Sequence, residues 1–184
     1  RIGRVKLVQC NFSQYSSRYD AFCAGETPVS FDPECAGGAL MDLNVYNISY
    51  IVGLFGEPNQ VHYLPNMERG IDTSGILILE YPNFVCQCTA AKDSSAHNSA
   101  QIIGTEGSIL IEPGSNNCQK LVVTRKGKEP YISEISDTPW WFEVLGISNF
   151  LIVPQDAVKE RRIRAMRSAV AVLEAARKNA HLDF

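Results

Sequence analysis

Two side chains capable of acid–base chemistry, Asp42 and Tyr46, lie four residues apart in a long, mostly apolar segment. Asp32-Pro33-Glu34 precedes the segment, and Gly56 with Glu57-Pro58 closes it, so we predict a helix that ends near Gly56. Residues four apart share one face of a helix, so we expect the two side chains to lie together. A carboxylate and a phenol placed in this way can orient a hydroxyl group and exchange a proton with it.

A structural interpretation stays open for both residues. Asp42, near the start of the predicted helix, can simply favour the positive end of the helix dipole. Tyr46 can be a half-buried core aromatic whose hydroxyl is hydrogen-bonded. A tyrosine has an ordinary pKa near 10, so a tyrosine that transfers protons at neutral pH needs a neighbouring cation to lower that pKa.

A second group of candidates lies in the loop that follows the first predicted strand. The loop contains Gln14, Tyr15 and Arg18, whose polar and aromatic groups suit a polyhydroxylated ligand. Long loops within compact domains often bind ligands, although an ordinary surface loop is equally compatible with these residues. Lys92, after a predicted hairpin strand, is a candidate for the rim of the same pocket, with a solvated turn as the alternative.

The elements that must position these residues are mostly strands. One strand is predicted over Gly3–Cys10, and short β-rich runs alternate with turns between Gln60 and Ile135. Most connections are too short for the crossovers that parallel strands need, so we expect a largely antiparallel sheet. The runs are Val61–Leu64, Gly75–Tyr81, Phe84–Ala90, Gln101–Ile103, Ser108–Ile111, Leu121–Arg125 and Tyr131–Ile135.

Two further helices are expected near the end of the chain. Pro139 suits the first turn of a helix over Trp140–Val153, and Asp156 can cap the helix that follows Pro154. The pattern therefore predicts an α+β fold, in which an open, largely antiparallel β-sheet has helices packed on one face. The expected apolar stripe of the last helix consists of Ile163, Met166, Val170 and Leu173.

The other face of the sheet needs a partner of its own. Three strand segments, Ile76–Leu79, Phe84–Cys86 and Ile109–Ile111, are too apolar for a face in contact with water. We expect a second subunit to cover this face, which gives a homodimer or a homotetramer.

Composition excludes several classes of partner. The chain has 184 residues, which suits one domain over 1–184, with 45% hydrophobic and 20% charged residues. A net charge of -3 argues against nucleic acid. The apolar segment between Gly37 and Gly56 contains Asp42, Asn44 and Asn47, so a core helix is favoured over a membrane span.

The cysteines and histidines indicate neither disulfides nor metal. Six irregularly spaced cysteines without a signal peptide favour buried, reduced cysteines in a cytoplasmic protein. Cys86 and Cys88 should place both sulfurs on one face of a strand. The histidines, His62, His97 and His181, lie far apart in the sequence, so no metal site is expected.

Four segments in register resemble the Gfo/Idh/MocA oxidoreductases, whose second domain carries a Gly-Gly-x-Leu-x-Asp-x-Gly-x-His or Tyr pattern. The resemblance extends over essentially the whole chain, including the long C-terminal helix. The segments are Ala36-Gly37-Gly38-Ala39-Leu40-Met41-Asp42-Leu43-Asn44-Val45-Tyr46, Leu54-Phe55-Gly56-Glu57-Pro58, Gly70-Ile71-Asp72 and Gly104-Thr105-Glu106-Gly107-Ser108-Ile109.

The resemblance implies a division of labour. An N-terminal Rossmann domain binds NAD or NADP and supplies a catalytic lysine, and a C-terminal α+β domain shapes the substrate pocket and forms the dimer. Typical substrates are sugars, cyclitols and related secondary alcohols or ketones. This chain has no Gly-x-Gly-x-x-Gly after an early strand, so we expect it to be the C-terminal domain, to lack a dinucleotide site and to be inactive alone.

The family pattern also suggests roles for residues. Tyr46 matches the position of the proton donor or acceptor, and Asp42 the position of a carboxylate that orients the substrate or the tyrosine. Asn44 replaces the usual glycine and is a candidate substrate contact. A non-catalytic oligomerisation module and a free-standing small-ligand binding domain are the alternatives.

Overall fold

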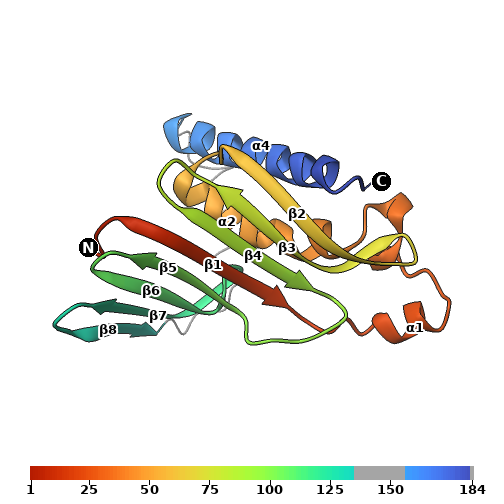
Figure 1. The fold of residues 1–184 in the computed structure, drawn as a ribbon, viewed down its shortest axis with the longest axis horizontal. Coiled ribbons are helices and arrows are strands. Elements are labelled where there is room, and N and C mark those ends of the chain that lie inside the picture. The colour runs from red at the N-terminus through yellow and green to blue at the C-terminus, as the bar shows by residue number, and fades with distance from the viewer. Residues whose placement is uncertain (135–155, 183–184) are drawn as a thin grey trace.

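The computed structural model describes residues 1–134 and 156–182, and its strands form one open sheet (Figure 1). The strand order is β2-β3-β4-β1-β5-β6-β7-β8. Every neighbouring pair is antiparallel except β1 with β4, which is parallel. The strands are β1 (Val5–Ser13), β2 (Gln60–Glu68), β3 (Ile71–Glu80), β4 (Val85–Ala91), β5 (Ser99–Gly104), β6 (Gly107–Gly114), β7 (Asn117–Arg125) and β8 (Lys128–Glu134).

The predicted open, largely antiparallel sheet is therefore confirmed. The parallel pair arises because β1 lies between two meanders, β2–β4 and β5–β8, and pairs with the inner strand of each. β1 also continues beyond Cys10, since Phe12 and Ser13 still pair with β4. The loop after β1 is correspondingly shorter than predicted and contains the short helix α1 (Tyr19–Cys23).

The helices pack on one face of the sheet, as predicted. The segment that begins after the double glycine forms a π-helical turn, η3 (Leu40–Asn44), and continues as α2 (Val45–Phe55). Helix α2 ends at Gly56, whose φ of 77° is in the left-handed region that glycine tolerates. The final helix α4 (Asp156–Asn179) packs against α2 and β2, while β7 and β8 extend beyond both helices (Figure 1).

Alternation along the strands separates the two faces of the sheet. On the helix side, Val8 and Cys10 of β1 pack with Leu77 and Leu79 of β3 and with Ile48 of α2. On the opposite side, apolar side chains are only partly covered, as the exposures of Ile76 (38%) and Val85 (41%) show. The core therefore lies between the sheet and the helix layer formed by α2 and α4.

The predicted apolar stripe of the last helix is correct at Leu173, which is 7% exposed, and wrong at Met166 and Val170. Met166 and Val170 are 67% and 63% exposed. Three buried positions of α4 have small side chains, Ser168, Ala169 and Ala176, whose weak hydrophobicity hid them from a search for large apolar residues. The buried residues of α4 are Ser168, Ala169, Val172, Leu173 and Ala176. The predicted helix over Trp140–Val153 lies outside the described residues.

Half of the cysteines are buried as expected. Cys10, Cys86 and Cys88 lie in the core, and the sulfurs of Cys86 and Cys88 are 3.6 Å apart on one face of β4. Burial was the wrong expectation for Cys23, Cys35 and Cys118, which are exposed because they lie in the loop region or at the start of β7. All six thiols are free. Within the described residues, no helix is both long and apolar enough to cross a membrane.

The turn before η3 requires glycine. Gly38 has φ +97°, and a Cβ there would lie 1.9 Å from Oδ1 of Asp72. We expect Gly38→Ala to lower the free energy of unfolding by roughly 2–4 kcal/mol, from backbone strain and overpacking together. Urea denaturation of the chain measures this loss.

Gly53 provides the matched control. It lies inside α2, and a Cβ there meets no atom within 4 Å. Gly53→Ala should raise the free energy of unfolding by about 0.5–1 kcal/mol, because alanine loses less conformational freedom in a helix. Equal effects of the two substitutions would contradict this account of the turn.

Candidate active site

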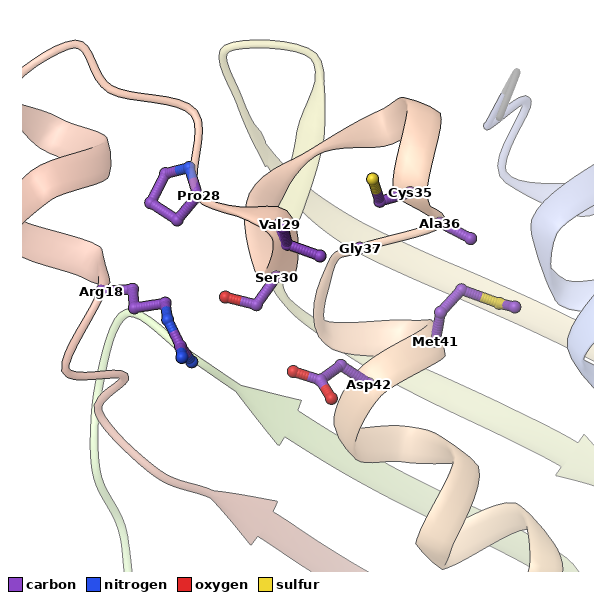
Figure 2. A pocket seen from close by; sticks show the side chains of 9 residues that line it. All are labelled: Arg18, Pro28, Val29, Ser30, Cys35, Ala36, Gly37, Met41 and Asp42. Atoms are coloured by element: carbon purple, nitrogen blue, oxygen red, sulfur yellow. The ribbon is translucent and has the colours of Figure 1, made fainter.

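A pocket of about 430 Å³ opens beside the start of η3 (Figure 2). Its walls come from the beginning of α1, from the 28–37 loop and from η3. The polar ends of Arg18, Ser30 and Asp42 turn toward the same space, and most of the remaining surface is apolar. The lining residues are Arg18, Pro28, Val29, Ser30, Cys35, Ala36, Gly37, Met41 and Asp42.

Asp42 supplies the carboxylate of this pocket. It lies on the π-helical turn η3, a local widening of the helix that often marks functional positions. Its side chain is 50% exposed, and Oδ2 accepts a hydrogen bond of 2.7 Å from Nζ of Lys92. Among the described residues, Oδ1 has no partner and is available to a ligand. Asp42 therefore lines the pocket, and its role in substrate binding or catalysis stays a prediction.

Lys92 lies underneath the pocket and does not line it. Only 2% of its side chain is exposed, and Nζ also donates to the backbone carbonyl of Ser30. The same ammonium lies 4.6 Å from the ring centroid of Phe31. The prediction that Lys92 contacts the ligand directly is therefore corrected, because the sheet and the loop cover its ammonium. Of the two partners, Asp42 lines the pocket.

Arg18 and Ser30 complete the polar lining. No described residue gives the guanidinium of Arg18 a hydrogen bond or an ion pair, and its side chain is exposed in the pocket. The hydroxyl oxygen of Ser30 is buried without a partner in the same part of the chain. The guanidinium of Arg18 and the carboxylate of Asp42 together provide donors and acceptors, the set that a hydroxylated ligand needs.

The other two loop candidates lie outside the pocket lining. Gln14 is exposed, and its backbone N–H donates to the carbonyl of Ala91. The hydroxyl of Tyr15 donates to Asp20 at 2.5 Å, and this hydrogen bond raises the pKa of Tyr15 above its ordinary value. The loop thus contributes Arg18 to the cavity, while Gln14 and Tyr15 lie beside it.

Tyr46 is accessible but is not among the residues that line the pocket. Its side chain is 46% exposed, and its ring packs edge-on against Phe12 with the centroids 5.5 Å apart. The structure therefore places Tyr46 beside the end of β1 and Asp42 at the pocket. The two side chains are not brought into contact by any interaction in the described part of the chain.

Asn44 is an internal packing residue, and its assignment as a substrate contact is corrected. Its side chain is fully buried and donates to the carbonyl of Cys88 at 3.4 Å. Nδ2 of Asn47 donates to Oδ1 of Asn44 and to the carbonyl of Thr89. These amides turn toward β4 because they satisfy backbone carbonyls in the helix–sheet interface.

Asp72, which was not a predicted site residue, fixes the start of η3. Its Oδ2 accepts hydrogen bonds from the backbone N–H of Leu40 at 2.7 Å and from the hydroxyl of Tyr63 at 2.6 Å. Burial raises the pKa of Asp72 to about 6, although its hydrogen bonds and the Lys92 charge act in the opposite direction. The signal for this residue was its place in the segment Gly70-Ile71-Asp72, near the start of β3.

Two stacked aromatic rings, each in contact with a cation, stabilise the loop that forms one wall of the pocket. The rings of Phe31 and Phe22 are stacked with centroids 4.8 Å apart, and Arg69 lies 4.5 Å from the far face of Phe22. Arg69 also donates to backbone carbonyls of Phe22, Gly25 and Glu26. With Lys92 over the ring of Phe31, the stack joins the loop to the turn between β2 and β3 and to the end of β4.

The structure is an α+β domain with an open sheet and a pocket at the start of η3. This chain belongs to the GFO/IDH/MocA C-terminal domain family, whose model matches residues 1–110. The resemblance inferred from the sequence is therefore confirmed.

Two curated relatives extend the comparison. The uncharacterized oxidoreductase YgjR of Escherichia coli (strain K12) is 33% identical over 130 residues, which cover 70% of this chain and 39% of that protein. The scyllo-inositol 2-dehydrogenase (NADP(+)) IolU of Bacillus subtilis (strain 168) is 39% identical over 115 residues, 61% of this chain and 34% of that protein.

A solved structure shows the same fold. Levoglucosan dehydrogenase, in complex with NADH and levoglucosan, aligns with a TM-score of 0.76 at 15% identity, covering 98% of this chain and 57% of that chain. The present chain spans about a third to two fifths of the length of the two curated relatives. Within the residues that the structure describes, no cluster of three or more His, Cys, Asp or Glu side chains could hold a metal ion.

The buried carboxyl of Asp72 predicts a pH dependence of stability. Its pKa is about 6 in the folded chain against an ordinary 3.8, so the folded state binds more protons between these values. The contribution of Asp72 to the free energy of unfolding therefore falls as pH rises from 4 to 7, by about 2 kcal/mol.

Asp72→Asn removes this titration. The free energy of unfolding of the variant, relative to wild type, should increase by about 2 kcal/mol between pH 4 and pH 7. Urea denaturation at a series of pH values measures the difference, in which contributions from the other carboxyls cancel. A difference that stays constant with pH would contradict the assignment.

Proposed function

We propose that this chain is the substrate-binding C-terminal domain of an NAD(P)-dependent oxidoreductase that acts on a sugar, a cyclitol or a related secondary alcohol or ketone. The observation that carries the proposal is the half-exposed carboxylate of Asp42, with one free oxygen, in a pocket that also contains Arg18 and Ser30. The names of IolU and of levoglucosan dehydrogenase support this substrate class, since both describe dehydrogenases of hydroxylated rings.

The chain's own residues bind and orient the substrate in this proposal. Asp42 accepts a hydrogen bond from a substrate hydroxyl, and Arg18 offers donors to neighbouring oxygens. NAD or NADP, held mainly by an N-terminal Rossmann domain of the full-length protein, supplies hydride acceptance or donation. Tyr46 exchanges the hydroxyl proton of the reacting carbon.

Tyr46 requires help that the described residues do not give. Its ring packs on Phe12, outside the pocket lining, and no cation contacts its hydroxyl in the described part of the chain. We propose that the N-terminal domain covers the space between Asp42 and Tyr46 and brings the cation that a proton-transferring tyrosine needs. The isolated chain should therefore be inactive.

We further propose that the open sheet face forms the subunit interface. In the register of the strands, Gln9, Gln101, Leu110 and Val122 lie side by side on the face opposite the helices. Ile76 and Val85 add partly exposed apolar area to the same face. An apolar face with a polar centre suits a partner of the same kind, in a homodimer or a homotetramer.

Substitutions in the full-length protein test the catalytic proposal. We expect Asp42→Asn and Tyr46→Phe each to lower kcat/KM by roughly 10²-fold, the range of positioned acid–base and orienting groups. Nicotinamide absorbance during turnover of a polyol such as scyllo-inositol is the measurement. Tyr131→Phe is the control, because Tyr131 is similarly exposed (54%) but lies on β8.

Two results would contradict the proposal. Unchanged kcat/KM in Tyr46→Phe would remove Tyr46 from proton transfer. A wild-type full-length protein that oxidises or reduces no polyol or ketose with either nicotinamide would favour a non-catalytic module.

A charge on the open face tests the interface. Leu110→Arg should convert the oligomer to monomers, because a buried, unpaired guanidinium is strongly disfavoured in an interface. Met166→Arg, on the exposed side of α4, should leave the mass unchanged. Sedimentation equilibrium of the full-length protein gives the masses, and a wild-type monomer at high micromolar concentration would rule out the proposed interface.

A further inference from the structure

We propose that Lys92 is a positioning residue, whose buried ammonium fixes the orientation of Asp42 and the distance between two walls of the pocket. The inference rests on the proposed function of that pocket and assigns Lys92 a role without contact to the substrate. A ligand meets Asp42 through Oδ1, while Lys92 keeps Oδ2.

The burial of Lys92 calls for a specific explanation. Its side chain is 2% exposed, and a lysine is almost never covered to this extent unless its charge is paired. Removing an ammonium from water carries a large cost, which a methionine or leucine of similar size would avoid. A charge retained in this position therefore has to do something that an apolar side chain cannot.

The contacts of the ammonium show what it does. One bond runs to Oδ2 of Asp42 on η3, at 2.7 Å, and another to the carbonyl of Ser30 in the loop. The third neighbour is the face of Phe31, 4.6 Å from Nζ to the ring centroid. Lys92 itself follows the end of β4. One cation thus ties the sheet to two separate walls of the pocket.

The two partners of the ion pair differ in exposure, and this difference defines their roles. The lysine is covered, whereas half of the Asp42 side chain remains exposed toward the pocket. An aspartate at neutral pH accepts hydrogen bonds and donates none. Oδ2 is engaged by Lys92 and Oδ1 has no partner among the described residues, so a ligand that presents a hydrogen-bond donor, such as a hydroxyl, fits at Oδ1.

The same ammonium sets the width of the pocket at Ser30. Ser30 and Asp42 face the same space from opposite sides of the bend that contains Gly37 (Figure 2). Their link runs through Nζ of Lys92, since no direct bond joins them in the described residues. Loss of the ammonium should therefore disturb both the direction of the carboxylate and the position of the loop, and so weaken catalysis through Asp42.

A kinetic double-mutant cycle in the full-length protein tests this coupling. We expect Lys92→Met to lower kcat/KM for scyllo-inositol by 10-fold or more, with the KM for the nicotinamide cofactor unchanged. In the Asp42→Asn background, the same substitution should cause no more than a twofold further loss, because its effect passes through Asp42. Lys120→Met, a partly exposed lysine on β7, is the control and should leave the kinetics unchanged.

Lys92→Gln is the second variant, in case Lys92→Met does not fold, since the amide keeps a donor for the carbonyl of Ser30. Losses that multiply in the double variant would show independent roles and overturn the proposal. Wild-type kinetics in Lys92→Gln and Lys92→Met would also overturn it. Failure of both variants to fold would assign Lys92 to stability alone, with the same consequence.

Crystal structures of the variants separate this inference from the proposed function. In the full-length Lys92→Gln or Lys92→Met protein, we expect the Asp42 carboxylate to adopt a different orientation and Ser30 to move away from η3. An unchanged Asp42 and Ser30 would overturn the positioning role. This comparison needs no turnover, so it decides about Lys92 even if the full-length protein has no oxidoreductase activity.

Discussion

The buried ammonium of Lys92 is the constraint on which the architecture of the pocket depends. Three segments that are distant in the sequence meet there: the end of β4, the loop at Ser30 and the turn η3 that contains Asp42. In an interior of low dielectric constant, such a charge is tolerated only with its partners in place, which makes the arrangement cooperative. The pocket therefore keeps its shape only while the contacts of Lys92 with Asp42 and Ser30 are in place.

Other features support this centre from two sides. Asp72 accepts the backbone N–H of Leu40 and so fixes the first turn of η3, while Gly38 permits the carboxyl to approach that closely. On the loop side, the stacked rings of Phe22 and Phe31 lie between the cations of Arg69 and Lys92. Each support places charge beside a group that compensates it. The carboxylate of Asp42 is consequently held both by Lys92 and by the turn η3 on which it lies.

The regular elements and one site residue could be predicted from local patterns. Alternation in the strands and the glycine-bounded apolar helix gave the sheet, the helix layer and the place of Asp42 at a cavity. The other features of the site and the core depend on contacts between residues distant in the sequence, which local patterns do not show. The sequence does not reveal that Lys92 is covered, because a lysine after a strand is ordinarily solvated. It does not reveal that Asn44 turns toward β4. It also does not reveal that α4 faces the core of the domain partly with small residues, and not with Met166 and Val170.

The central claim is that a hydroxylated substrate meets the nicotinamide at the pocket beside Asp42. A crystal structure of the full-length protein with NAD or NADP and a bound polyol tests this claim most directly. The account predicts a ligand hydroxyl on Oδ1 of Asp42, Lys92 still bonded to Oδ2, and the nicotinamide ring over the same ligand. A polyol bound beneath the nicotinamide at another place, with Asp42 and Arg18 facing empty solvent, would contradict it.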